Sequence, residues 1–146
     1  MDTANILPVI QAVFKGADAL DWHTVEQSFA PEVVYDYTSM AGGQPLTLTP
    51  SAITGMWKQF LPGFDKTAHR ISDFIFTREG DTVVVHFSGH ATHTIGTATW
   101  IVEGNYETRL SHHHDKWQLI FFKFNLQRQE GDLQLPAQAQ QRAGAK

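Results

Sequence analysis

The sequence has 146 residues, 42% of them hydrophobic, so we expect one domain with a sizeable core. A net charge of −4 without a dense basic cluster argues against nucleic acid as a partner. Cysteine is absent, which excludes disulfides, thiol nucleophiles and zinc–thiolate sites. The sequence contains neither a membrane-length apolar run nor a signal-peptide pattern, so we expect no membrane partner and a cytoplasmic location.

The first half of the chain carries the signals of three helices. Apolar residues recur at helical spacing from Ile6 to Leu20. Asp21 is a predicted N-cap for a second, short helix. Thr49 followed by Pro50 predicts the start of the third helix, since proline is tolerated in the first helical turn.

Residues 66–93 are predicted to form a long hairpin that carries three histidines of interest. The composition is rich in Val, Ile, Thr and Phe, with a break at 78–81. A two-residue loop at Glu79-Gly80 would place His69 opposite His90. Alternation then predicts two faces. The mixed face would hold His69, Ile71, Asp73, Ile75, Val84, His86, Ser88 and His90. The apolar face would hold Phe74, Phe76, Val83, Val85, Phe87 and Ala91.

The mixed face has two interpretations. It suits the wall of a cavity that binds a ligand and moves protons. It equally suits a half-solvated outer surface with ordinary histidines, and a one-residue bulge would turn part of it over. The apolar face, if exposed, would form an interface, which favours a homo-oligomer, a dimer first and a trimer second.

The order of elements predicts the fold class. Further strands are expected at 33–38, 100–111 and 117–128. Helices followed by an antiparallel meander indicate an α+β protein, in which a cone-shaped, curved antiparallel or mixed sheet wraps around three N-terminal helices. Such a cone tends to enclose a cavity. We expect a single domain over residues 1–130 and a mobile tail over residues 131–146.

Several spaced segments together resemble the SnoaL-like family of the nuclear-transport-factor-two-like superfamily. They are Ala-Asp-Ala-Leu-Asp-Trp at 17–22, Phe-Ala-Pro-Glu-Val-Val-Tyr-Asp-Tyr at 29–37 and Thr-Ala-His-Arg-Ile at 67–71. Within the superfamily the nearest enzyme pattern is that of scytalone dehydratase. The resemblance implies a cystatin-like α+β cone, from about Ile6 to Arg128, and often a dimer or trimer.

The resemblance also implies site residues. Asp18 matches the acid that the family pairs with a catalytic histidine, His69 matches that histidine, Tyr37 a carbonyl-binding tyrosine, and His90 a second histidine. Thr108 stands where the dehydratase has a serine. Two positions depart from the pattern, Ala17 for a second tyrosine and Leu110 for an asparagine.

These matches predict a cofactor-independent lyase or isomerase, dehydratase-like, acting on a small hydrophobic and cyclic carbonyl compound. Histidine titrates near neutral pH, and a nearby carboxylate holds its tautomer and stabilises its cation. The candidate substrate-binding residues are Tyr35, Met56, Trp57, Phe60, Phe64, His86 and Thr108. The alternative is a non-catalytic ligand-binding or assembly module of the same fold.

A metal site is not predicted. His86 and His90 are four residues apart on a strand, so their Cα atoms lie about 13 Å apart, too far for two ligands of one zinc ion. The run His112-His113-His114 falls in a turn and is expected to be a solvated loop with casual metal affinity.

Overall fold

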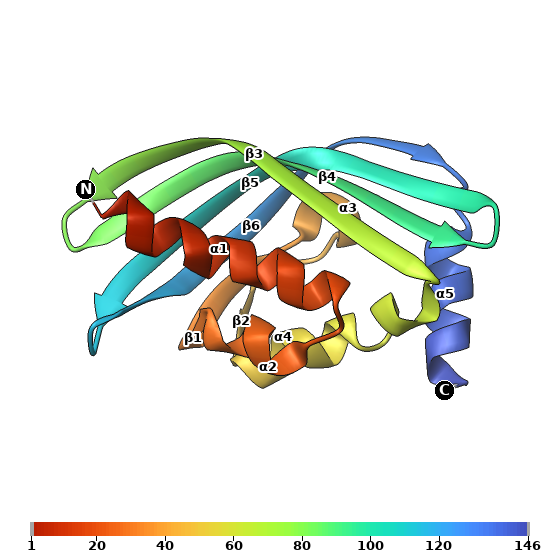
Figure 1. Ribbon diagram of the computed structural model, residues 1–146, viewed down its shortest axis with the longest axis horizontal. Coiled ribbons are helices and arrows are strands. Elements are labelled where there is room, and N and C mark those ends of the chain that lie inside the picture. Colours follow the sequence, from red (N-terminus) through yellow and green to blue (C-terminus); the bar gives the residue numbers. More distant parts are fainter. Residues whose placement is uncertain (1, 146) are drawn as a thin grey trace.

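The fold is built on one six-stranded sheet, seen in a computed structural model that describes residues 2–145 (Figure 1). The strands follow the order β2-β1-β6-β5-β4-β3. They span Phe29–Asp36 (β1), Leu46–Leu48 (β2), Lys66–Glu79 (β3), Thr82–Ile95 (β4), Ala98–His113 (β5) and Lys116–Gly131 (β6). β1 runs parallel to β6, and the other neighbours are antiparallel. The predicted α+β class with a mixed, curved sheet is confirmed.

The helices lie below the arch of the sheet, on its concave side (Figure 1). They are α1 (Thr3–Asp18), α2 (Trp22–Gln27), α3 (Thr38–Ala41), α4 (Pro50–Trp57), the 3-10 turn η1 (Leu61–Gly63) and α5 (Leu135–Gly144). α1 buries Ile6, Ile10 and Val13 against the sheet, as their spacing predicts. Asp21 and Thr49 cap α2 and α4 through their side chains. None of the described helices is both long and apolar enough to cross a membrane.

A bulge in β3 changes the register of the long hairpin. Glu79 lies opposite Thr82, so the loop is Gly80-Asp81 rather than Glu79-Gly80. The pairing shifts by one residue between Ser72 and Ile75, and Asp73 there adopts a φ of 60°. The predicted pair of His69 with His90 is therefore wrong.

Beyond the bulge each histidine has a different partner from the one predicted. His69 faces Ala91, and Arg70 faces His90. Facing residues of an antiparallel pair share one side of the sheet. His69 therefore shares the inner side with Ala91, whereas His90 shares the outer side with Arg70.

The apolar face of the hairpin is the inner face of the cone. Val83, Val85 and Phe87 are almost fully buried within the single chain. Phe87 packs edge-on against Phe14 of α1, with ring centroids 5.9 Å apart. We expected a partner subunit to cover this face, and that argument for an oligomer is wrong because α1 already covers it.

The C-terminal segment differs from the mobile tail expected from its composition. Residues 135–144 form α5, which packs against η1, and Leu135 and Ala139 are fully buried. A Cβ added to Gly63 would come within 1.8 Å of the Ala139 carbonyl oxygen. This close approach of two backbones gives a polar segment a packing site that its hydrophobicity does not reveal.

Candidate functional site

Asp18 and His69 form the central polar contact of the inner face. Asp18 is the last residue of α1, and His69 lies on β3, which passes that helix end. Asp18 Oδ1 lies 2.6 Å from His69 Nδ1, and Asp18 Oδ2 accepts the His69 backbone N–H at 2.8 Å. The Thr67 hydroxyl donates to Asp18 Oδ1 at 3.2 Å. Three contacts therefore fix the carboxylate and the imidazole together.

The chemistry of these two groups fixes the tautomer of the imidazole. An ionised carboxylate only accepts hydrogen bonds, so Nδ1 of His69 carries the proton. The lone pair of a neutral His69 then resides on Nε2. Phe14 of α1 packs against the ring, with centroids 5.5 Å apart, and limits its rotation. The arrangement presents an oriented base.

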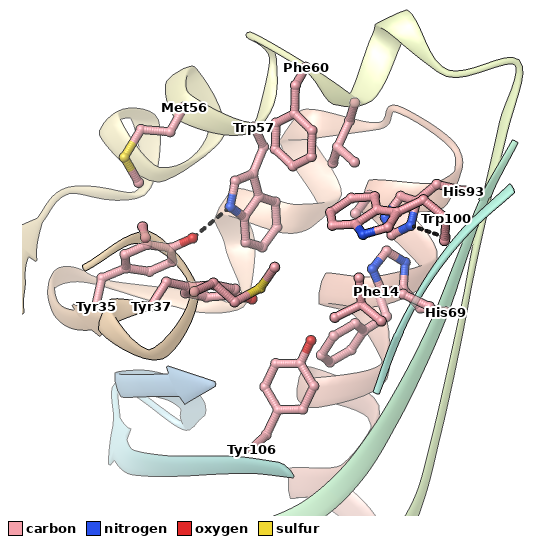
Figure 2. Close-up of a pocket in the computed structure, with 16 residues that line it drawn as sticks. Phe14, Tyr35, Tyr37, Met56, Trp57, Phe60, His69, His93, Trp100 and Tyr106 are labelled. Atoms are coloured by element: carbon pink, nitrogen blue, oxygen red, sulfur yellow. Dashed lines mark hydrogen bonds between the residues drawn. The ribbon is translucent and has the colours of Figure 1, made fainter. Parts of the chain in front are cut away.

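His69 borders a cavity of about 310 Å³ inside the cone (Figure 2). Aromatic and aliphatic side chains dominate the wall, as is usual for sites that bind hydrophobic molecules. The lining residues are Phe14, Ala17, Tyr35, Tyr37, Met40, Ala41, Met56, Trp57, Phe60, Leu61, His69, Ala91, His93, Trp100, Val102 and Tyr106. This wall has no Lys, Arg, Asp or Glu side chain among the described residues.

Three tyrosines supply hydroxyl groups at another part of the cavity. The rings of Tyr35 and Tyr37 stack 4.8 Å apart, and Trp57 Nε1–H donates to the Tyr35 hydroxyl at 2.9 Å. Burial raises the pKa of Tyr35, Tyr37 and Tyr106 above the ordinary value. All three phenols therefore stay protonated at neutral pH and are available as hydrogen-bond donors.

His93 is a second histidine of the cavity wall. Its Nδ1–H donates to the Trp100 carbonyl oxygen at 3.0 Å, so its lone pair resides on Nε2. Its ring centroid lies 6.0 Å from that of His69. Burial lowers the pKa of His93 to about 4, which keeps the ring neutral at neutral pH.

Four predicted site residues lie outside the cavity. His86 and His90 are on the outer face of the sheet, where they lie 3.6 Å from Glu107 and 3.5 Å from Glu103. Thr108 is fully buried in the core, with its hydroxyl donating to Val85 O. Phe64 stands behind the wall, 4.8 Å from the His93 ring. The bulge in β3 brings His69 to the inner side, whereas His90 lies among the outward-facing residues of β4, as His86 does.

The remaining candidates meet in or beside the cavity. Tyr35, Tyr37, Met56, Trp57, Phe60 and His69 line it, and Asp18 lies directly behind His69. Sequence reasoning missed His93, Trp100, Tyr106 and Met40, which also line it. Phe87, Ala91 and His93 are an even number of residues apart on β4, so they point to the same side of the sheet. His93 was therefore identifiable as a cavity residue once the apolar face was recognised as the inner one.

The described residues contain no group of three or more His, Asp or Glu side chains that could hold a metal ion. His112 and His113 end β5, and His114 and Asp115 adopt the positive φ values of a tight turn. The rings of His113 and His114 lie 4.1 Å apart in an exposed position. The run is therefore a surface turn, remote from the cavity residues in sequence and sheet position.

Comparison with known proteins gives the family. The model of the SnoaL-like domain matches residues 1–123. The chain belongs to the SnoaL-like domain family. The match ends before α5, so the C-terminal helix lies outside the matched region. No curated protein matches the chain.

Solved structures with this fold share little sequence with the chain. A protein from Kribbella flavida is 21% identical, with a TM-score of 0.79 and coverage of 98% of this chain and 97% of that one. A putative scytalone dehydratase from Novosphingobium aromaticivorans is 14% identical, with a TM-score of 0.74 and coverage of 90% of this chain and 87% of that one. A putative dehydratase of the nuclear-transport-factor-two-like family from Streptomyces avermitilis is 11% identical, with a TM-score of 0.74 and coverage of 87% and 97%. At these identities the likeness concerns the fold alone.

Proposed function

We propose that this protein is a cofactor-independent lyase or isomerase that removes a proton from carbon beside a carbonyl group. The observation that carries the proposal is the 2.6 Å contact of Asp18 with His69 Nδ1 at the wall of an apolar cavity. A ligand-binding module needs a cavity, but it has no need of an imidazole held by a carboxylate.

In the proposed reaction His69 Nε2 accepts the proton from the substrate carbon. The carbon–hydrogen bond breaks, and its electron pair moves into the carbonyl to form an enolate. The imidazolium that results has its second N–H directed at Asp18, whose negative charge stabilises it. Return of the proton to another atom completes an isomerisation, and loss of a β-leaving group completes an elimination.

His93 takes the place beside His69 that we had expected for His90. It is neutral, so it does not add a second positive charge next to the imidazolium. Its unprotonated Nε2 is a hydrogen-bond acceptor for a water molecule or a leaving hydroxyl group. Trp57, Phe60 and Trp100 supply apolar walls for the body of the substrate.

The chemistry of the wall favours an uncharged substrate. A carboxylate or phosphate ligand would enter a cavity in which no Lys or Arg side chain is among the described lining residues. A small hydrophobic ring ketone would instead replace water and leave only its carbonyl oxygen in need of a donor.

The test is hydrogen–deuterium exchange at the carbon beside the carbonyl. A panel of ring ketones, including 1-tetralone, is incubated with the protein in D₂O and followed by proton NMR. We expect exchange with the wild type, a loss of at least about a hundredfold in His69→Ala and Asp18→Asn, and wild-type rates in His90→Ala, the matched histidine on the outer face. Equal rates in all four proteins, or ketone binding without exchange, would favour the ligand-binding alternative.

A further inference from the structure

All three tyrosines of the chain meet at the cavity. The rings of Tyr35 and Tyr37 stack with centroids 4.8 Å apart, and Trp57 Nε1–H donates to the Tyr35 hydroxyl. Figure 2 shows the hydroxyl end of Tyr106 directed into the space that His69 and Trp57 also border. The Asp18–His69 pair contains none of these groups, so the three tyrosines have no part in holding His69.

The hydroxyl of Tyr35 already has a partner, whereas Tyr106 presents its hydroxyl to the cavity. The indole N–H of Trp57 can only donate, so it occupies an acceptor position of Tyr35. Tyr106 lines the cavity, and its hydroxyl end is directed into the space that His69 borders. A protonated phenol has one O–H to donate, so Tyr106 can donate to an acceptor on a ligand in that space.

The ring of Tyr106 is held firmly in place. It stacks on Phe87 at 4.9 Å and contacts Phe14 and Phe124 at 5.2 and 4.8 Å. On another side it lies against the backbone of Gly89, where an added Cβ would come within 2.4 Å of the ring. A donor fixed in this way needs no reorganisation when charge develops on its partner.

We propose that Tyr106 binds the carbonyl oxygen of the substrate, and that the substrate class is uncharged ring ketones of about ten to fifteen non-hydrogen atoms. The size follows from a cavity of about 310 Å³, roughly ten water volumes of ~30 Å³ each. The proposal rests on the proposed function. As His69 removes the proton and the electron pair moves to the carbonyl oxygen, the Tyr106 O–H donates to the enolate oxygen.

The protonation state of the phenol suits this role. Burial raises the pKa of Tyr106, so the hydroxyl donates throughout the neutral pH range. Tyr106 touches the reacting oxygen in this arrangement, whereas Tyr35 and Tyr37 line the cavity beside it.

The experiment uses 1-tetralone and tetralin, the second of which lacks the carbonyl oxygen. Binding of each is measured by calorimetry, and the carbonyl stretch of carbonyl-¹³C 1-tetralone is recorded by infrared spectroscopy. In Tyr106→Phe we expect 1-tetralone to bind about three- to tenfold more weakly, tetralin to bind unchanged, and the carbonyl stretch to lose its shift to lower frequency. His90→Ala should match the wild type in every measurement.

The results separate this proposal from the proposed function. His69→Ala should lose proton exchange and keep the shifted carbonyl stretch. A shifted stretch with no exchange in the wild type would support the carbonyl site and count against the proton transfer. A stretch that is the same in wild type and Tyr106→Phe would overturn the proposal, and so would a shift that Tyr37→Phe abolishes and Tyr106→Phe leaves intact.

Discussion

His69 lies opposite Ala91 across the β3–β4 hairpin, and this pairing directs its imidazole into the cone. A regular hairpin from the observed turn would instead place Arg70 opposite Ala91. The one-residue shift at the bulge thus decides which of two adjacent side chains enters the cavity.

Deletion of Asp73 should therefore keep proton exchange. Two β3 residues, Asp73 and Phe74, stand opposite the single β4 residue Phe87, so removal of one leaves the other pairs of the hairpin in place, and His69 stays opposite Ala91 on the inner side. Asp73 is exposed and has a φ of 60°, a value that glycine adopts freely. Asp73→Gly, the matched control, should keep the bulge and the exchange rate. The measurement is exchange by NMR alongside thermal unfolding, and a folded deletion variant that loses exchange while Asp73→Gly keeps it would contradict the register argument.

Asp18→Asn should separate activity from stability. The amide keeps the size of the side chain but removes the charge that stabilises the imidazolium, so proton exchange should fall at least about a hundredfold. The side chain accepts three hydrogen bonds and loses one acceptor oxygen, so the free energy of unfolding should fall by only about 1 kcal/mol. Exchange rates and urea denaturation of the same preparation provide the comparison. An equal loss of folded protein and of activity would mean that Asp18 is a structural residue only.

His93 should make the stability of the protein depend on pH. Its pKa is about 4 in the folded chain and about 6.5 in the unfolded chain, because burial disfavours the cation. The unfolded chain therefore binds the proton first, and stability falls as the pH drops from about 6.5 to about 4. The full effect of this one group is on the order of 3 kcal/mol.

His93→Asn tests this linkage, since the Asn amide can still donate to the Trp100 carbonyl. We expect its free energy of unfolding to change less between pH 7 and pH 4.5 than that of the wild type, measured by urea denaturation. His90→Ala, which removes an outer-face histidine, should retain the wild-type pH dependence. If the free energy of unfolding changes equally with pH in all three proteins, His93 does not control acid stability.

Gly63→Ala should loosen α5. A Cβ at this position meets the Ala139 backbone at 1.8 Å, so either η1 or α5 must move, and we expect a loss of about 1–3 kcal/mol. Gly55→Ala is the matched control, because nothing lies within 4 Å of its added Cβ in α4 and alanine favours the helix by up to about 1 kcal/mol. The midpoint temperature of thermal unfolding should therefore fall in Gly63→Ala and rise in Gly55→Ala. A neutral Gly63→Ala would show that α5 is readily displaced.

The sequence alone determined the fold class and part of the cavity wall, because these depend on local patterns and composition. Helical spacing located α1, and the Thr49-Pro50 pair located the start of α4. The spaced residues of the SnoaL-like pattern identified Asp18 and His69 as the candidate pair, and they indeed lie in contact.

Tertiary structure decided which histidine stands beside His69. A strand pattern has a period of two, so a single bulge at Asp73 reverses every side chain beyond it, and nothing in the local composition marks that position. It also decided that Val85 and Phe87 face α1 instead of a partner, and that α5 packs on Gly63. These contacts join residues far apart in the chain, and their energy comes from shape fit between surfaces that no single segment contains.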